Sequence, residues 1–181
     1  MSGEATRLVR EFMKRLKVTV DGSLVADSKR FVFTPGLLVS VAIFAVPVER
    51  FGGSVKPLFR RAFIKYGTRR AMKDEGLGAR GALEKYLADN TSTGFGRGEL
   101  VEFNEQRVVF RVYGSLYGEE AGNYFKMKGM ETEPLCTQGF VAEGILNYFA
   151  EKEGKPLFSS QEVKCRAVGD EYCEFVLERK T

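Results

Sequence analysis

Residues 133–177 read EPLCTQGFVAEGILNYFAEKEGKPLFSSQEVKCRAVGDEYCEFVL, and this stretch decides how the rest of the chain is interpreted. It contains all three cysteines, Cys136, Cys165 and Cys173. Apolar side chains recur at three- and four-residue spacing over residues 137–153, which predicts a helix. Cys136 therefore lies at a predicted helix N-terminus, where free backbone N–H groups favour a thiolate.

The last two cysteines fall on a predicted hairpin. Residues 157–167 and 172–177 are typical of two strands, and residues 168–171 have the composition of a tight turn. A turn centred there places Cys165 and Cys173 opposite each other, with β-carbons about 4.5–5.5 Å apart. That distance suits two thiolates on one metal ion and, after small adjustments, a disulfide.

The residues alone leave three interpretations of the cysteines open. They are three unrelated buried thiols, a disulfide that leaves one cysteine over, or a closed structural zinc site. A zinc site needs a fourth ligand, and because the chain has no histidine we expect Glu162, three residues before Cys165. Residues three apart on a regular strand point to opposite faces, so this pair requires a bulge or a strand end between its members.

The motifs CTQGF at 136–140 and EVKCRAVGDEYCEF at 162–175 resemble the signature of the 4-vinyl reductase domain family, a group of predicted hydrocarbon-binding domains. The similarity is strongest over 94–177 and weaker over 31–93. In members that serve as phenol-sensing input domains of bacterial transcription activators, a cysteine, a Glu-x-x-Cys pair and a further cysteine hold a zinc ion. The resemblance thus implies the ligand set Cys136, Glu162, Cys165 and Cys173.

The resemblance also implies the fold. It is an α+β arrangement with an antiparallel sheet packed with helices, similar to the haem nitric-oxide-binding domains and the vesicle-tethering subunits of the Golgi. An apolar ligand cavity between helices and sheet comes with it. We expect residues 31–181 to form this small-molecule-binding domain, preceded by an extension over residues 1–30.

The extension has its own pattern. Residues 4–16 predict an amphipathic helix, and Asp21-Gly22 predicts a hairpin within residues 17–26. An apolar helix is expected over residues 35–45. The apolar faces of 4–16 and 35–45 together exceed what one small domain needs to cover itself, which predicts a homodimer.

The middle of the chain supplies the remaining elements. Periodicity predicts helices over about 55–74 and 79–89 and strands over 99–103 and 107–113. Residues 114–134 have four glycines among aromatic residues and no clear period, so we expect a mobile loop that covers the ligand.

Aromatic and aliphatic stripes on these elements predict an apolar ligand pocket of roughly 300 Å³ or more. Two helices and one strand are expected to contribute its walls. The expected lining residues are Phe59, Phe63, Tyr66, Val108, Phe110, Val112, Phe140, Ile145 and Phe149.

Composition removes several functions. Without histidine there is no Ser-His-Asp or Cys-His catalysis and no proximal histidine for haem, so neither is expected. The net charge is only +4 and no nucleic-acid motif is present, which argues against a nucleic-acid partner. The apolar run 37–48 is too short to span a bilayer, and the first residues resemble no signal peptide, so we expect a cytoplasmic protein.

We therefore expect a non-enzymatic sensor or carrier of a small apolar or aromatic molecule, stabilised by structural zinc. One alternative is an auxiliary protein or enzyme in tetrapyrrole vinyl reduction, since the family takes its name from that reaction. The other is an interaction scaffold whose cavity holds a structural acyl chain.

Overall fold

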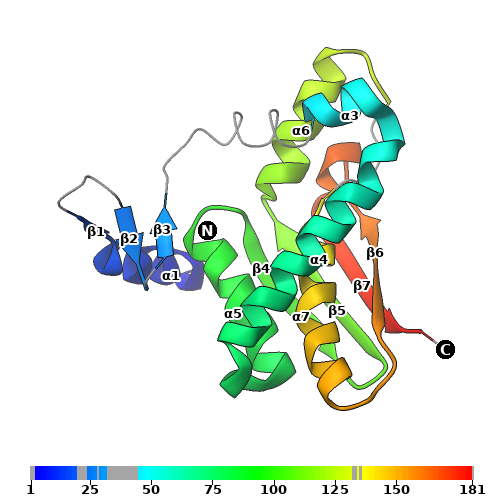
Figure 1. Ribbon diagram of the computed structural model, residues 1–181. Coiled ribbons are helices and arrows are strands. Elements are labelled where there is room, and N and C mark those ends of the chain that lie inside the picture. Colours follow the sequence, from blue (N-terminus) through cyan, green and yellow to red (C-terminus); the bar gives the residue numbers. More distant parts are fainter. Residues whose placement is uncertain are drawn as a thin grey trace.

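The computed structural model describes residues 3–19, 24–27, 29–31, 45–131, 134 and 136–180. Its main body is a four-stranded antiparallel sheet in the order β4-β5-β7-β6, with helices over one face (Figure 1). The strands are β4 (Arg97–Phe103), β5 (Arg107–Tyr113), β6 (Phe158–Lys164) and β7 (Cys173–Arg179). The predicted α+β class with an antiparallel sheet is confirmed.

Helices α4, α5 and α7 pack together with the sheet, whereas α3 and α6 lie at one end of it (Figure 1). The helices are α3 (Val46–Phe51), α4 (Lys56–Lys73), α5 (Gly78–Ser92), α6 (Leu116–Met127) and α7 (Gln138–Lys152), with 3-10 turns η2 (Gly52–Val55), η3 (Glu75–Leu77) and η4 (Arg166–Val168). In the described part of the chain no helix combines the length and the apolar character that crossing a membrane requires.

The N-terminal part is set to one side of this body (Figure 1). It consists of α1 (Gly3–Arg15) and a small antiparallel sheet of β1 (Lys17–Val18), β2 (Leu24–Ala26) and β3 (Lys29–Phe31). Helix α1 contacts α5 and buries Phe12, while Val9 and Met13 stay exposed. The predicted helix over 35–45 lies outside the described residues except for its last position, and the homodimer remains a prediction.

Strand β5 runs through the centre of the core. Val108, Phe110 and Val112 point inward and are fully buried, because alternate residues of a strand face the same side. Phe110 pairs with Phe175 of β7, and the two rings stack with centroids 4.8 Å apart. On the other face Arg111 Nε donates to Glu174 Oε2 at 2.5 Å.

Helices α4 and α7 cross with their backbones in contact. A β-carbon added at Gly67 of α4 would lie far inside van der Waals distance of the Val141 carbonyl oxygen. The reciprocal holds at Gly144 of α7, where the obstacle is the Ile64 carbonyl oxygen. Only glycine at both positions permits this approach.

The predicted loop over residues 114–134 is wrong, because most of it is helix α6. Ser115 caps the helix, its hydroxyl accepting from the Gly118 N–H at 3.3 Å. The glycines that suggested a loop are needed for packing: an added β-carbon would lie 2.9 Å from Arg166 Cβ at Gly118 and 2.7 Å from Ala167 Cα at Gly122. α6 is thereby placed against η4 and not over a pocket as a flexible lid.

We predict that Gly144→Ala lowers the free energy of unfolding by about 1–3 kcal/mol, because the added methyl group forces α4 and α7 apart. Without that contact the substitution should stabilise the helix by up to about 1 kcal/mol, so the sign of the change is informative. Chemical denaturation measures it. Gly76→Ala is the matched control, since nothing lies within 4 Å of the added β-carbon; equal effects of the two substitutions would contradict the prediction.

Candidate functional site

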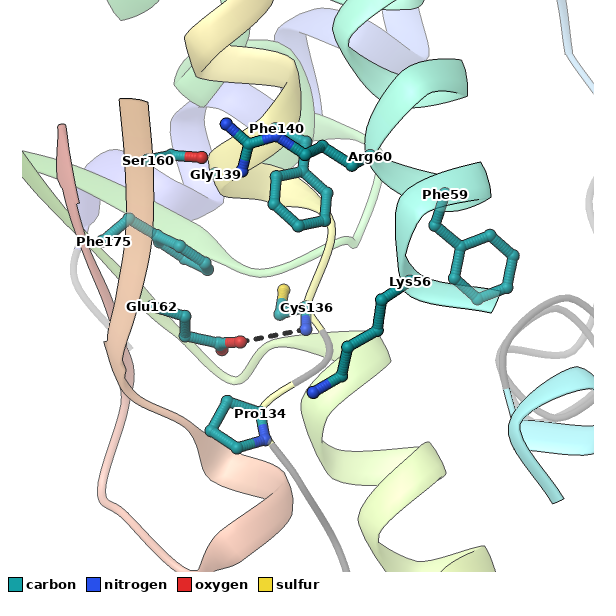
Figure 2. A pocket seen from close by; sticks show the side chains of 10 residues that line it. All are labelled: Lys56, Phe59, Arg60, Pro134, Cys136, Gly139, Phe140, Ser160, Glu162 and Phe175. Carbon is teal, nitrogen blue, oxygen red and sulfur yellow. Dashed lines mark hydrogen bonds between the residues drawn. The ribbon is translucent and has the colours of Figure 1, made fainter. Parts of the chain in front are cut away.

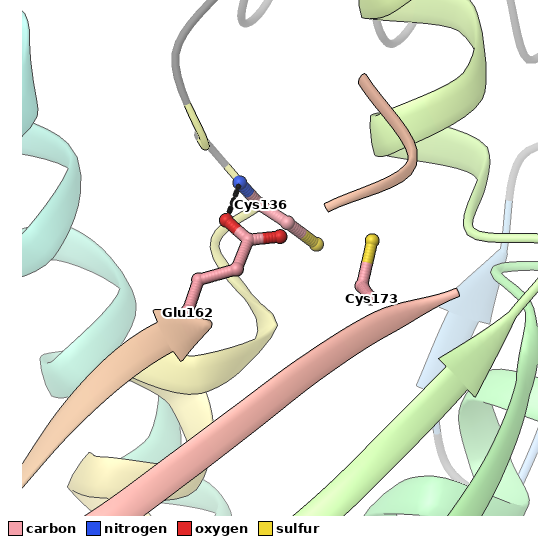
Figure 3. Close-up of side chains that lie close together, drawn as sticks. All are labelled: Cys136, Glu162 and Cys173. Atoms are coloured by element: carbon pink, nitrogen blue, oxygen red, sulfur yellow. Dashed lines mark hydrogen bonds between the residues drawn. The ribbon is translucent and has the colours of Figure 1, made fainter. Parts of the chain in front are cut away.

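Three side chains from separate elements converge beside the first turn of α7. Cys136 precedes α7, Glu162 lies on β6 and Cys173 begins β7. One ligand atom from each lies within 4.8 Å of the other two, and the side chains point toward one another (Figure 3). Two sulfurs and a carboxylate within that distance are a set that one metal ion can bridge.

Cys165, the fourth predicted ligand, is adjacent to this group but not within the same 4.8 Å set. It is fully buried, and its thiol hydrogen-bonds with Cys173 and with Glu162. All three cysteines are free and buried, so the disulfide alternative does not describe the structure. We refer to Cys136, Glu162, Cys165 and Cys173 as the cysteine cluster.

The bulge that the sequence required lies between Glu162 and Cys165. Glu162 pairs with Phe175 and Lys164 pairs with Glu174, so the register shifts at Val163. The extra residue turns Cys165 toward the side that Glu162 faces. β6 then ends, and residues 166–168 form η4 instead of the predicted continuation of the strand.

The electrostatics of the cysteine cluster disfavour negative charge. Burial, with the neighbouring Cys165 thiol second, raises the pKa of Glu162 to about 9. A hydrogen bond with Cys173, followed by burial, raises the pKa of Cys165, and a hydrogen bond with Cys136 raises the pKa of Cys173. Glu162 Oε2 accepts from the Cys136 N–H at 3.0 Å, but Oε1 is buried with no hydrogen-bond partner among the described residues.

These observations fit a bound cation. A divalent ion would supply the partner that Glu162 Oε1 lacks and would favour the charged forms that burial now disfavours. Thiolates with one carboxylate are donors that zinc accepts.

A cavity of about 250 Å³ reaches the cysteine cluster from one side, and we call it the cysteine-side cavity (Figure 2). Its lining residues are Lys56, Phe59, Arg60, Pro134, Cys136, Gly139, Phe140, Ser160, Glu162 and Phe175. The Lys56 side chain extends toward Pro134 and Cys136 (Figure 2). This cavity therefore combines aromatic rings with two cations and a carboxyl group.

Arg60 is held at the rim of the cysteine-side cavity by a buried carboxylate. Its Nη2 donates to Glu143 Oε1 at 2.5 Å, and the guanidinium lies 5.2 Å from the centroid of the Phe140 ring. Glu143 Oε2 also accepts from the backbone N–H and the hydroxyl of Ser160, at 2.9 and 2.7 Å. These bonds satisfy the buried charge and join α4, α7 and β6.

A second cavity, of about 210 Å³, lies on the other side of the first turn of α7 and has no charged lining residue; we call it the tyrosine-lined cavity. Its lining residues are Phe63, Tyr66, Tyr86, Asn90, Phe95, Tyr117, Thr137, Gln138 and Val141. Burial raises the pKa of Tyr86 and of Tyr117, so both phenols are neutral at pH 7.

The polar lining groups of this cavity form a chain of hydrogen bonds. Asn90 hydrogen-bonds with the Tyr86 hydroxyl. Its Nδ2 donates to Gln138 Oε1 at 3.3 Å, and Gln138 Nε2 donates to the Phe95 carbonyl oxygen at 3.4 Å. The network fixes the side of the cavity where α5 meets α7.

The structure distributes the predicted pocket residues over three places. Phe59 and Phe140 line the cysteine-side cavity, and Phe63 and Tyr66 line the tyrosine-lined cavity. The remaining five lie in the hydrophobic core: Val108, Phe110, Val112, Ile145 and Phe149.

Sequence reasoning missed Tyr86, Tyr117 and Thr137. A signal for Tyr86 was available, because Asn90 follows it by one helical turn on the same inward face. For Thr137 the only signal was its position directly after Cys136.

Comparison with known proteins supports this description. No curated protein matches the chain by sequence. Among solved structures, the crystal structure of the phenol-responsive sensory domain of the transcription activator PoxR with phenol superposes with a TM-score of 0.70 at 17% sequence identity, over 99% of this chain and 92% of that chain. The two proteins share the fold. Residues 122–179, which contain the whole cysteine cluster, match the family model of the 4-vinyl reductase domain, and the resemblance inferred from the cysteine motifs is thereby confirmed.

Proposed function

We propose that this chain is a sensor or carrier domain that binds a small apolar or aromatic molecule in the tyrosine-lined cavity. The observation that carries the proposal is the lining itself. Five aromatic rings and one valine surround a few fixed polar groups, which is the usual composition of a small-molecule site. The phenol-responsive domain with the same fold supports a ligand of this kind.

The volume limits the ligand's size. At about 210 Å³ the tyrosine-lined cavity is smaller than the 300 Å³ expected from the sequence, and it is below the usual range for drug-sized ligands. A molecule on the order of one aromatic ring fits such a space, whereas a tetrapyrrole does not. The cysteine-side cavity is slightly larger, but its cations and carboxyl group make it a poorer host for an uncharged apolar molecule.

We predict that a one-ring aromatic compound raises the melting temperature of the protein, because it binds only the folded state. Val141→Phe should abolish this shift by filling the tyrosine-lined cavity. Phe140→Leu should preserve it, because the adjacent residue lines only the cysteine-side cavity. Differential scanning fluorimetry measures both variants, with circular dichroism as a check of folding. The opposite pattern would move the ligand to the cysteine-side cavity, and no shift with any aromatic compound would refute the function.

We also propose that the cysteine cluster holds one structural zinc ion through Cys136, Glu162, Cys165 and Cys173. The orphaned Glu162 Oε1 and the three buried thiols support this. When bound, zinc would neutralise thiolate and carboxylate charge and cross-link the start of α7 to the hairpin of β6 and β7. The adjacent residues Thr137 and Gln138 line the tyrosine-lined cavity, so the same cross-link would fix one of its walls.

We predict about one zinc per chain by elemental analysis, and loss of that zinc together with a lower melting temperature in Cys165→Ser and Cys173→Ser. Glu162→Gln should weaken zinc binding less than either cysteine substitution, because three thiolates remain. Glu143→Gln is the matched control, since that glutamate is equally buried but its carboxylate is occupied by Arg60 and Ser160. A fully stable protein that contains no metal would exclude the zinc proposal.

The metal-free protein should lose stability as the pH rises from about 5 to about 9. Glu162 keeps its proton in the folded state up to a pKa of about 9, whereas an unfolded glutamate releases it near pH 4.3. The folded state therefore binds more protons than the unfolded state across that interval, and its stability falls with increasing pH. Thermal melts of chelator-treated protein at several pH values test this. Glu162→Gln should flatten the slope, and an unchanged slope would show that another group causes it.

A further inference from the structure

Thr137 is the N-cap residue of α7, yet its side chain does not cap the helix. A threonine in this position normally accepts a hydrogen bond from an N–H of the first turn. Here the backbone of Thr137 is already helical, with φ −83° and ψ −2°, and its side chain makes no cap hydrogen bond. The residue is only 1% exposed, and Oγ1 has no hydrogen-bond partner among the described residues.

A buried hydroxyl without a partner costs stability, so this arrangement calls for an explanation. Thr137 lines the tyrosine-lined cavity, next to Gln138. The other polar side chains there are already engaged: Asn90, Gln138 and Tyr86 bond to one another and to the Phe95 carbonyl, and the Tyr66 hydroxyl accepts from Arg70. Among the described lining residues, only Thr137 contributes a buried polar atom that lacks a hydrogen bond.

We propose that Thr137 is the specificity-determining residue of this cavity and that its hydroxyl hydrogen-bonds a polar group on the ligand. The inference rests on the proposed function and narrows the ligand class to uncharged one-ring aromatics that carry a small hydrogen-bonding substituent, such as a hydroxyl group. A threonine hydroxyl both donates and accepts, so either kind of partner is suitable. An anionic substituent is disfavoured, because no lysine or arginine lines the cavity.

The test compares phenol with toluene, which replaces the hydroxyl group by a methyl group of similar size. Calorimetry gives the affinity of both compounds for the wild-type protein, Thr137→Val and Thr137→Ser. Thr137→Val keeps the shape of the side chain and removes the hydroxyl, whereas Thr137→Ser retains it. We expect Thr137→Val to weaken phenol binding roughly 3- to 10-fold, the usual effect of one neutral hydrogen bond. Toluene binding should stay the same or improve, and Thr137→Ser should still favour phenol.

A second measurement separates ligand recognition from a structural role. Without ligand, Thr137→Val should leave the melting temperature unchanged or raise it, because it removes an unsatisfied buried hydroxyl. A lower melting temperature together with equal losses for phenol and toluene would assign Thr137 a structural role and overturn the inference.

The remaining outcomes are also decisive. If phenol and toluene both bind but their affinity ratio is the same in the wild-type protein and in Thr137→Val, the inference fails and the proposed function stands. If neither compound binds the wild-type protein, the proposed function fails, and the role of Thr137 fails with it.

Discussion

The contact between the backbones of α4 and α7 is the constraint on which the rest of this domain depends. Gly67 and Gly144 let each helix approach a carbonyl oxygen of the other. Interiors are packed too tightly to absorb an extra methyl group at such a point without movement of a whole element. Once α7 is fixed against α4, the start of α7 is fixed as well, and with it the positions from which Cys136 and Thr137 extend.

That first turn of α7 is a junction between two kinds of chemistry. Cys136 belongs to the cysteine cluster, whereas Thr137 and Gln138 face the tyrosine-lined cavity. Three consecutive residues thus connect a polar cross-link with an aromatic chamber. Because the peptide backbone between them is short and helical, a displacement at one side is transmitted to the other without any intermediate side chain.

Much of the architecture could be predicted from sequence, because periodicity reports which side of an element is buried. The alternation of Val108, Phe110 and Val112 identified the inward face of β5, and the need for Glu162 to share a side with Cys165 required the bulge at Val163. Helix α6 was missed because glycine has the same appearance in a loop as at a close helix contact.

The cavities were harder to predict for a related reason. Periodicity does not give the rotation of one helix relative to its neighbours, nor does it separate a filled interior from a hollow one. Phe140 and Val141 are consecutive, yet they line different cavities, and Ile145 lies in the solid core. Those outcomes depend on where Gly67 and Gly144 let the helices meet, which is a property of the assembled fold.

The bulge at Val163 has a further consequence, because β6 is an edge strand of the main sheet. An exposed regular edge is a template for pairing with a strand of another chain, and a bulge interrupts the spacing that such pairing needs. The opposite edge strand, β4, carries its own register shift between Leu100 and Glu102. Both margins of the sheet are thus protected against edge-to-edge aggregation, and on one of them the irregularity that offers this protection is the same one that brings Glu162 and Cys165 to a common side.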